Sequence, residues 1–263
     1  MYAGRFEALG VAQGNCRVTG SMKWDAVEVA PAGVVDAPTA SLARQIADTM
    51  GIDRTRPLVV AGSTGPGEEA LLHDACTRAF PEGVQLLCAP RKPERFEEAA
   101  AAMPGCVRRS SATGRPSGAN VDAGADGRQA RFLLDTIGEL RAAYTLADVV
   151  VMGRSFGRLY GSDPIEPVSL RRATVIGPRV GDFESVVRAL ESAGGLARAT
   201  AESIGPVLRR LIDQPSERDA LIRRGVACIE SQRGATARHA ELLLSLSDRI
   251  RQGRGTQAGC GRA

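Results

Sequence analysis

The sequence predicts an α/β fold, a doubly wound, Rossmann-like parallel sheet followed by terminal helices. Short apolar runs typical of buried strands alternate along the chain with amphipathic stretches of helical periodicity. The apolar runs lie at 58–61, 84–89, 132–134, 149–152 and 174–176. The helical stretches lie at about 67–79, 93–103, 138–146 and 181–192. Strands and helices that alternate in this way form parallel sheets joined by helical crossovers.

The flanking segments complete the expected organisation. Residues 1–37 form a preamble, strand-like around 16–20, and a Pro/Gly/Ala linker. The Rossmann-like domain extends over 38–250 and begins with a helix from about Thr39 to Met50. Within it, the polar segment 104–128 predicts a long surface loop.

The C-terminal part is predicted to be helical from residue 200 to about Ile250. Pro206 and Pro215 are expected to interrupt these helices. Residues 251–263 are rich in Gly and Arg and predict a flexible tail.

Composition excludes several classes of function. Aromatic residues make up 4% of the chain, which argues against a base-stacking surface for nucleic acid. The six cysteines form no CxxC pair and there are two histidines, so we expect no zinc site and no cofactor. Cys88 lies in an apolar run and is expected to behave as a small hydrophobe. Scattered thiols indicate a reducing compartment, and no apolar run approaches the roughly 18 residues of a membrane span, so we expect a cytoplasmic protein.

Ligands of a doubly wound sheet bind beyond the carboxyl ends of its strands, and two loops there carry suitable residues. In Gly62–Glu69, glycines and a helix N-terminus could approach an oxyanion, with Ser63 and Thr64 as candidate donor contacts; the alternative is a capped helix start. In Pro90–Arg95, three cations could meet a phosphate, or could be a solvated helix start.

Two further loops follow later strands. In Asp135–Leu140, a capped helix could leave the backbone at 137–138 open to a nucleobase, or the segment could serve capping alone. The last loop contains Ser155, and then Asp163 and Glu166 at capping-box spacing, with a proline at the first helical position between them. The alternative there is that a carboxylate accepts the ribose hydroxyls of a nucleotide.

The order and spacing of these motifs resemble one family. GSMKWD, GSTGPGEE, PRKPER, DTIGEL, GRSF with GSDPIEP, and Gly177-Pro178 with Phe183 are similar to the C-terminal half of bacterial 3-deoxy-D-manno-octulosonic acid (Kdo) transferases. The resemblance covers about residues 5–250. It implies one half of a GT-B fold, and an inverting, metal-independent transfer of Kdo from CMP-Kdo to a lipid A precursor in lipopolysaccharide biosynthesis.

The resemblance also implies roles for particular residues. Lys23 would stabilise charge on the departing CMP, and Glu166 would bind the ribose. The remaining nucleotide contacts would be Pro90, Arg91, Ile137, Gly138, Glu139, Asp163, Pro164 and Ile165. The sequence departs from the family pattern at Lys92, where histidine is usual, and at Arg154 and Tyr160, where glycine is usual. It also has Asp163 where the family has asparagine.

In that family an N-terminal domain carries the acceptor site, a glutamate base and a membrane-anchoring segment. Residues 1–56 do not resemble it, so we expect either a truncated form or half of a split enzyme with a separate N-terminal half. Through that region or partner we expect peripheral attachment to the cytoplasmic face of the inner membrane. The alternatives are a catalytically inactive nucleotide-binding module or a GT-B enzyme that uses another nucleotide sugar.

Overall fold

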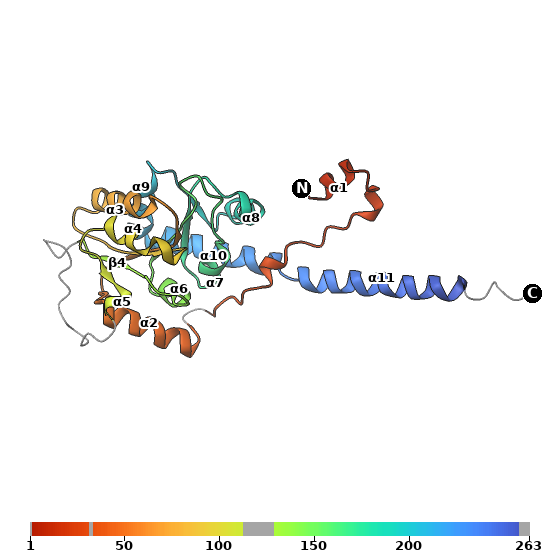
Figure 1. The fold of residues 1–263 in the computed structure, drawn as a ribbon, viewed down its shortest axis with the longest axis horizontal. Helices are drawn as coiled ribbons and strands as arrows, with labels where there is room; N and C mark the ends of the chain where they lie inside the picture. Colours follow the sequence, from red (N-terminus) through yellow and green to blue (C-terminus); the bar gives the residue numbers. More distant parts are fainter. Residues whose placement is uncertain (1, 32–33, 113–128, 258–263) are drawn as a thin grey trace, which may run out of the picture. The chain divides into compact units, whose positions relative to one another are not determined.

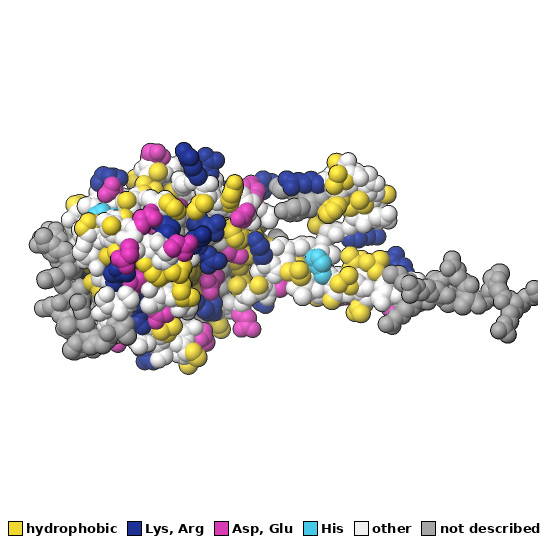
Figure 2. Space-filling view, viewed as in Figure 1, with side chains coloured by type: hydrophobic (Ala, Val, Ile, Leu, Met, Phe, Trp, Pro, Cys, Tyr) yellow, Lys and Arg dark blue, Asp and Glu magenta, His cyan; other side chains and the backbone are white. Residues whose placement is uncertain are grey.

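The computed structural model describes residues 2–31, 34–112 and 129–257. The chain forms two compact units: a sheet unit, Val29–Ile229, and a terminal unit made of Met1–Glu28 and Glu230–Ala263 (Figure 1). On the visible face of the sheet unit, Lys/Arg and Asp/Glu side chains are interspersed, without a field of one sign (Figure 2). The excess of four positive charges is therefore not gathered on that face.

The sheet unit contains a seven-stranded sheet in the order β3-β4-β2-β1-β5-β6-β7, in which every pair of neighbours is parallel. The strands are β1 Leu58–Thr64, β2 Gln85–Pro90, β3 Val107–Arg108, β4 Arg131–Leu133, β5 Val149–Met152, β6 Ala173–Ile176 and β7 Ala197–Arg198. From β1 the chain adds β2, β3 and β4 on one side of this strand, and it then crosses to β5 on the other side of β1. The sheet order therefore reverses between β1 and β5, which confirms the predicted doubly wound fold.

Helices cover both faces of this sheet. They are α2 Ala37–Met50, α3 Glu68–Ala79, α4 Phe96–Ala101, α5 Arg109–Ala112, α6 Leu140–Tyr144, α7 Ile165–Ser169, α8 Glu184–Ser192, α9 Ile204–Asp213 and α10 Pro215–Gln232. In Figure 1, α3 and α9 lie on one side of the sheet and α2 and α6 on the other. Both faces of β1 are thus covered, which is why all seven of its residues are buried and apolar or small.

Side-chain alternation along β1 assigns its two faces. Val59 and Ala61 pack in the core cluster with Leu72 of α3 and Leu208 of α9. The next residue, Gly62, points the other way, because a Cβ there would meet the ring of Tyr144 in α6. A full burial of each such leucine contributes about 1.5–3 kcal/mol, so this core holds the strand ends in fixed positions.

The terminal unit contains α1 (Tyr2–Ala8), two short 3-10 helices, Gln13–Asn15 and Met22–Trp24, and α11 (Ala235–Gln257). Asp25 joins its two segments, because its carboxylate accepts the backbone N–H groups of Gly234 and Thr236 at 2.6 and 2.7 Å. Hydrogen bonds from Thr236 and Gly234 lower the pKa of Asp25 to about 2. The carboxylate thereby caps the first turn of α11.

Several expectations about segment boundaries need correction. The preamble was predicted to be strand-like around 16–20, but among the described residues no strand precedes β1; an alternating pattern without a partner strand forms no ladder. Helix α11 extends to Gln257, past the expected boundary at 250, while 258–263 lie outside the described residues. Pro206 lies in the first turn of α9, which tolerates proline, and Pro215 begins α10.

The polar segment 104–128 is only partly described. It contains the two-residue strand β3 and the short helix α5 before residue 113. Residues 113–128, which hold the rest of the predicted loop, lie outside the described residues. In the helices that the structure describes, none is both long and apolar enough to cross a bilayer.

Candidate functional site at the carboxyl edge of the sheet

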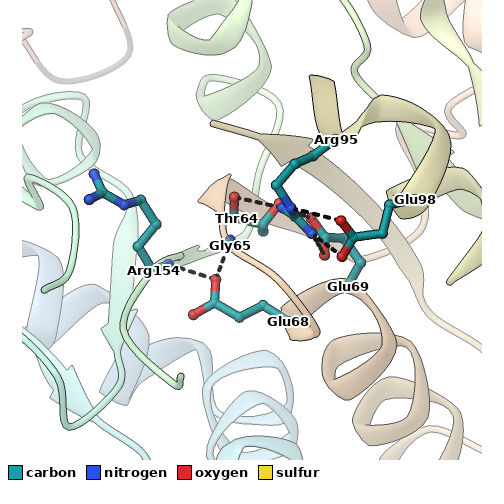
Figure 3. Close-up of polar contacts among 7 residues, drawn as sticks. All are labelled: Thr64, Gly65, Glu68, Glu69, Arg95, Glu98 and Arg154. Carbon is teal, nitrogen blue, oxygen red and sulfur yellow. Dashed lines mark hydrogen bonds and ion pairs between the residues drawn. The ribbon is translucent and has the colours of Figure 1, made fainter. Parts of the chain in front are cut away.

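The loop after β1 lies at the reversal of sheet order, and its two acids are both engaged within the protein (Figure 3). Glu68 is 2% exposed. Its Oε2 accepts the N–H groups of Gly65 and Arg154 at 2.7 and 2.6 Å, and its Oε1 accepts those of Ser155 and Phe156 at 2.8 and 2.9 Å. One buried carboxylate therefore joins the β1 loop to the β5 loop and takes up the amides that an external anion would use.

Glu69 joins the same loop to the loop after β2, on the other side of β1. Its carboxylate accepts two hydrogen bonds from the guanidinium of Arg95 at 3.0 and 2.9 Å and one from the hydroxyl of Thr64 at 2.6 Å (Figure 3). Arg95 also donates to the Thr64 carbonyl and pairs with Glu98. Burial alone would lower the pKa of Arg95, but its bonds to Glu69 and Glu98 raise it. Arg95 therefore acts as framework that holds the β2 loop to the β1 loop.

The predicted donor contacts Ser63 and Thr64 lie at the end of β1. The pairing of β1 with β2 shifts register between Gly62 and Thr64, and Ser63 there has a φ of 56°. Since the Thr64 hydroxyl donates to Glu69, this side chain is used inside the protein. The loop therefore differs from both alternatives, because its N-cap Gly67 offers no side-chain cap and its polar groups are engaged within the protein. Donor contact by Ser63 and Thr64 stays a prediction.

The β2 loop presents Arg91 to solvent directly after the buried Pro90. The backbone N–H of Arg91 donates to the Thr64 carbonyl at 3.1 Å, which fixes where the side chain starts. Lys92 pairs with Glu94 at 3.3 Å, and both side chains are largely exposed. Of the three cations predicted to meet a phosphate, Arg91 is the exposed one whose guanidinium has no ion pair in the described residues.

The loop after β4 is held by two arginines and a serine. Asp135 accepts the N–H and hydroxyl of Ser110 at 2.8 and 2.5 Å and pairs with Arg108 at 2.7 Å. Burial by itself would raise the pKa of Asp135, but these hydrogen bonds outweigh it and lower the pKa. Asp135 therefore anchors α5 to the end of β4 instead of serving as a simple helix cap.

Glu139 is fixed in a similar way. Arg109 donates to both of its oxygens, at 2.8 and 3.0 Å, and the hydroxyl of Thr136 also donates to it. Burial favours a raised pKa for Glu139, whereas the bonds from Arg109 and Thr136 prevail and lower it. Between these anchors Ile137 is 72% exposed, and Gly138 has a φ of 88° with open space around it. The turn at 137–138 is therefore accessible, and contact of its backbone with a nucleobase stays a prediction.

The loops after β5 divide into a buried and an open part. Ser155 is fully buried; its hydroxyl donates to the Met152 carbonyl at 2.6 Å and accepts the Gly177 N–H at 2.8 Å, so it joins the ends of β5 and β6. Asp163 accepts the N–H of Ile165 at 3.0 Å. Pro164 was predicted at the first helical position, but it is the N-cap of α7, which begins at Ile165. Asp163 therefore supports the start of α7 without the capping box that its spacing to Glu166 suggested, because it precedes the N-cap and Glu166 faces Arg141.

Glu166 lies in the first turn of α7 and is directed toward α6. Its carboxylate is 3.6 Å from the guanidinium of Arg141, and both side chains are about 40% exposed. Such an exposed pair contributes little stability. Glu166 thus keeps a solvent-accessible carboxylate at the mouth of the sheet.

Tyr144 shows which of these loops converge. Burial raises the pKa of its phenol, the charges of Glu166 and Asp163 raise it further, and the charge of Arg91 opposes them. Arg91 from the β2 loop and both carboxylates from the β5 side therefore act on one buried hydroxyl at the end of β1. The role of Tyr144 was not predicted from the sequence. The glycine at position 62, inside an apolar strand, could have indicated it, because a side chain there would overlap the Tyr144 ring.

Lys23 lies in the terminal unit, in the 3-10 helix Met22–Trp24, where its N–H donates to the Ser21 hydroxyl. Its predicted role stays a prediction. In the part of the chain that is described, no group of three His, Cys, Asp or Glu side chains is arranged to hold a metal ion. Cys88 is fully buried in β2, and burial raises its pKa, so this thiol behaves as a small hydrophobe.

Comparison with known proteins agrees with this geometry. The chain is 31% identical to the 3-deoxy-D-manno-octulosonic acid transferase of Bordetella pertussis over 236 residues, which are 86% of this chain and 50% of that protein. It is 26% identical to the transferase of Haemophilus influenzae over 91% of this chain and 53% of that protein. The chain is a homologue of the Kdo transferases. It spans about half the length of these curated relatives. No family model matches the sequence.

Solved structures show the same fold. The C-terminal CMP-Kdo binding domain of WaaA from Acinetobacter baumannii superposes with a TM-score of 0.64 at 23% identity, over 74% of this chain and 99% of that domain. HepE from Anabaena, in complex with UDP and glucose, superposes with a TM-score of 0.51 at 12% identity, over 82% of this chain and 53% of that one. The sheet unit therefore has the fold of one half of a GT-B glycosyltransferase.

Proposed function

We propose that the chain is the donor-binding half of a Kdo transferase, and that it binds CMP-Kdo for transfer of Kdo to a lipid A precursor in lipopolysaccharide biosynthesis. The observation that carries the proposal is the 31% identity to a Kdo transferase over 86% of the chain. The name of the A. baumannii domain, which matches along almost all of its length, supports CMP-Kdo as the donor. The proposed place of action is the cytoplasmic face of the inner membrane.

The site supports this proposal through three groups at one edge. Arg91 offers an exposed guanidinium at the end of β2, suited to a phosphate. Glu166 offers an accessible carboxylate to the ribose hydroxyls. The exposed turn at Ile137 and Gly138 offers backbone groups to the cytosine. Asp163, Pro164 and Ile165 shape the start of α7 beside the ribose, and Pro90 places Arg91.

The chemistry requires a negative charge to be stabilised as CMP departs. Preorganised cations at that position lower the barrier because they need no reorganisation during the reaction. In the proposed inverting, metal-independent reaction, Arg91 supplies such a cation, and a base outside the described site takes the proton of the acceptor hydroxyl. The role that the family resemblance gives to Lys23 stays a prediction. Glu139 and Glu68 act differently, since their hydrogen bonds to Arg109 and to backbone amides make them framework.

Calorimetric titration with CMP, UMP and GMP tests the donor assignment. We expect CMP to bind most tightly, because the predicted contacts at 90–91, 137–138 and 163–166 form a cytidylate site. Equal affinities for the three nucleotides, or no binding of any, would contradict the assignment and leave the fold unaffected.

A transfer assay tests the second part of the proposal. The 263-residue chain, with CMP-Kdo and a lipid A precursor, is assayed with and without the N-terminal half of a relative. Alignment of two substrates between GT-B halves can account for about 7–11 kcal/mol of a barrier, so we expect transfer only with the added half. Transfer by the chain alone would show that it carries its own acceptor site. CMP binding without transfer in either case would favour a nucleotide-binding module.

A further inference from the structure

Arg154, the second residue after β5, has an unusual backbone conformation. Its φ is 59°, in the left-handed region that a bulky L residue rarely adopts. It follows Gly153, where a Cβ would lie 2.5 Å from the Ser63 carbonyl oxygen, so the β1 and β5 loops touch at this point. Strained conformations of this kind persist only when the surrounding structure determines them, and they gather at ligand sites.

Glu68 determines this conformation. Its carboxylate accepts the N–H of Arg154 and those of the next two residues, Ser155 and Phe156. Oxygens that bind three successive amides leave the chain no freedom to rotate there. The carboxylate is itself fixed, because it also accepts the N–H of Gly65 in the β1 loop. The backbone of Arg154 is thereby held at the reversal of sheet order, where ligands of doubly wound sheets bind.

The side chain of Arg154 points away from Glu68, the acid that holds its backbone. Figure 3 shows its guanidinium directed to the opposite side from Glu69, Glu98 and Arg95. Within the described residues, this half-buried guanidinium forms no hydrogen bond or ion pair, whereas Arg95, Arg108 and Arg109 are all paired. A half-buried cation without an internal partner is suited to a bound oxyanion.

We propose that Arg154 is a specificity-determining residue that binds an anionic oxygen of the nucleotide-sugar donor, and that Glu68 is the positioning residue that aims it. The inference rests on the proposed function and adds a contact to it. The oxyanion is either the phosphate of the nucleotide or the carboxylate of the sugar, which present the same chemistry to a guanidinium. Arg91 and Arg154 then hold the donor from the β2 and β5 loops on either side of β1.

Arg154→Gly separates binding from folding. Glycine adopts a positive φ without strain, so the melting temperature should stay the same or rise. Loss of the guanidinium should weaken donor affinity about tenfold in calorimetry. Arg158→Ala, which removes the same charge from an exposed position in this loop, should leave affinity within about twofold. CMP and CMP-Kdo are both titrated: a loss with both assigns the phosphate, and a loss with CMP-Kdo alone assigns the carboxylate.

A double-mutant cycle tests the positioning role of Glu68. In Glu68→Gln an amide group faces two backbone N–H groups, so the loop should shift and donor affinity should fall severalfold. In the Arg154→Gly background the same change should have little effect on affinity, which a purely structural role would not produce. If Glu68→Gln does not fold, Glu68→Asp, which retains the charge on a shorter side chain, replaces it in the cycle.

The outcomes distinguish the two proposals. If the wild type binds and Arg154→Gly binds both CMP and CMP-Kdo with unchanged affinity, this inference is overturned and the proposed function stays intact. An equal loss of affinity in Arg158→Ala would also overturn it, because a diffuse charge effect would then explain the result. Failure of the wild-type chain to bind CMP and CMP-Kdo would overturn the proposed function and this inference with it.

Discussion

Two segments at the carboxyl edge were predicted to hold the nucleotide, and the structure uses their acids differently. In 135–139, the carboxylate of Asp135 is buried and that of Glu139 is 15% exposed, and they are bonded to Arg108 and Arg109 respectively. In 163–166, the carboxylate of Glu166 is about 40% exposed, and its cationic partner lies at 3.6 Å. Both segments follow a parallel strand and begin a helix, so their positions in the chain do not separate them.

The difference lies in what faces each acid. The end of β3 and the start of α5 bring two adjacent arginines, Arg108 and Arg109, against the first segment, whereas α6 presents the half-exposed Arg141 to the second. An acid that is already paired fixes the backbone, and an acid that remains accessible can bind a ligand. The comparison therefore places the acids of 135–139 in the framework, with the turn at 137–138 exposed, and it leaves the carboxylate of Glu166 accessible for the donor contact that we propose.

The largest expected effect is a loss of folding stability when the ion pair of segment 135–139 is broken. Arg109→Ala would leave Glu139 buried without its cation, so the free energy of unfolding should fall by about 3–5 kcal/mol in urea denaturation. Arg141→Ala is the matched control on the open segment, where the exposed pair should contribute less than about 1 kcal/mol. Equal losses in the two variants would remove the distinction between the segments.

The second largest effect that we expect is a loss of stability at acid pH, caused by Asp135 and Glu139. The pKa values of Asp135 and Glu139 are both lowered in the folded protein by hydrogen bonds from Ser110, Arg108, Arg109 and Thr136, against the opposing effect of burial. The unfolded chain therefore binds more protons at acid pH, where these groups titrate near about 3.9 and 4.3. Their contribution is complete above about pH 5 and is lost as the pH falls toward the lowered folded values.

Urea midpoints measured between pH 6 and pH 3 test this dependence. Glu139→Gln should lose less stability than the wild type over that range, because one of the two linked carboxylates is absent. The two curves should converge toward acid pH. Parallel curves would mean that Glu139 is not coupled to folding.

The strands were predictable from sequence, and their loops only in part. Five apolar runs matched strands because both faces of a parallel sheet are covered, which leaves a local signal. The two-residue edge strands β3 and β7 carry too few residues for such a signal. The strand-like pattern around 16–20 was misleading because alternation alone does not provide a partner strand.

The side-chain roles depended on partners far away in the chain. Glu68 bonds to amides 86 to 88 residues later, and Arg109 meets Glu139 across 30 residues. Residue type and spacing at one loop do not contain that information. Arg91 and Glu166 could be proposed as contacts from sequence, because a charged residue beyond a strand's carboxyl end is where ligands of such sheets bind, and their contact with the donor stays a prediction.

A smaller effect is expected from Arg91→Ala. The side chain is exposed and has no ion pair within the described segments, so stability should change by less than about 0.5 kcal/mol. CMP affinity should fall about tenfold, since a charge-assisted bond to phosphate contributes roughly 1.5 kcal/mol or more. The control is Lys92→Ala, which removes a neighbouring cation that is paired to Glu94. The CMP affinities of the two variants are compared by calorimetry. Equal losses in both would indicate a general charge effect.

The smallest expected effect is that of Glu166→Gln. The change keeps the shape of the side chain and removes its charge, so hydrogen bonds to ribose become neutral and CMP affinity should fall about fivefold. Affinity for deoxy-CMP should fall less, because one hydroxyl partner is already absent. The free energy of unfolding should move by less than about 0.5 kcal/mol, since the pair with Arg141 is long and accessible. A loss of stability with CMP affinity unchanged would make Glu166 a framework residue of α7, and the open segment would then resemble 135–139 after all.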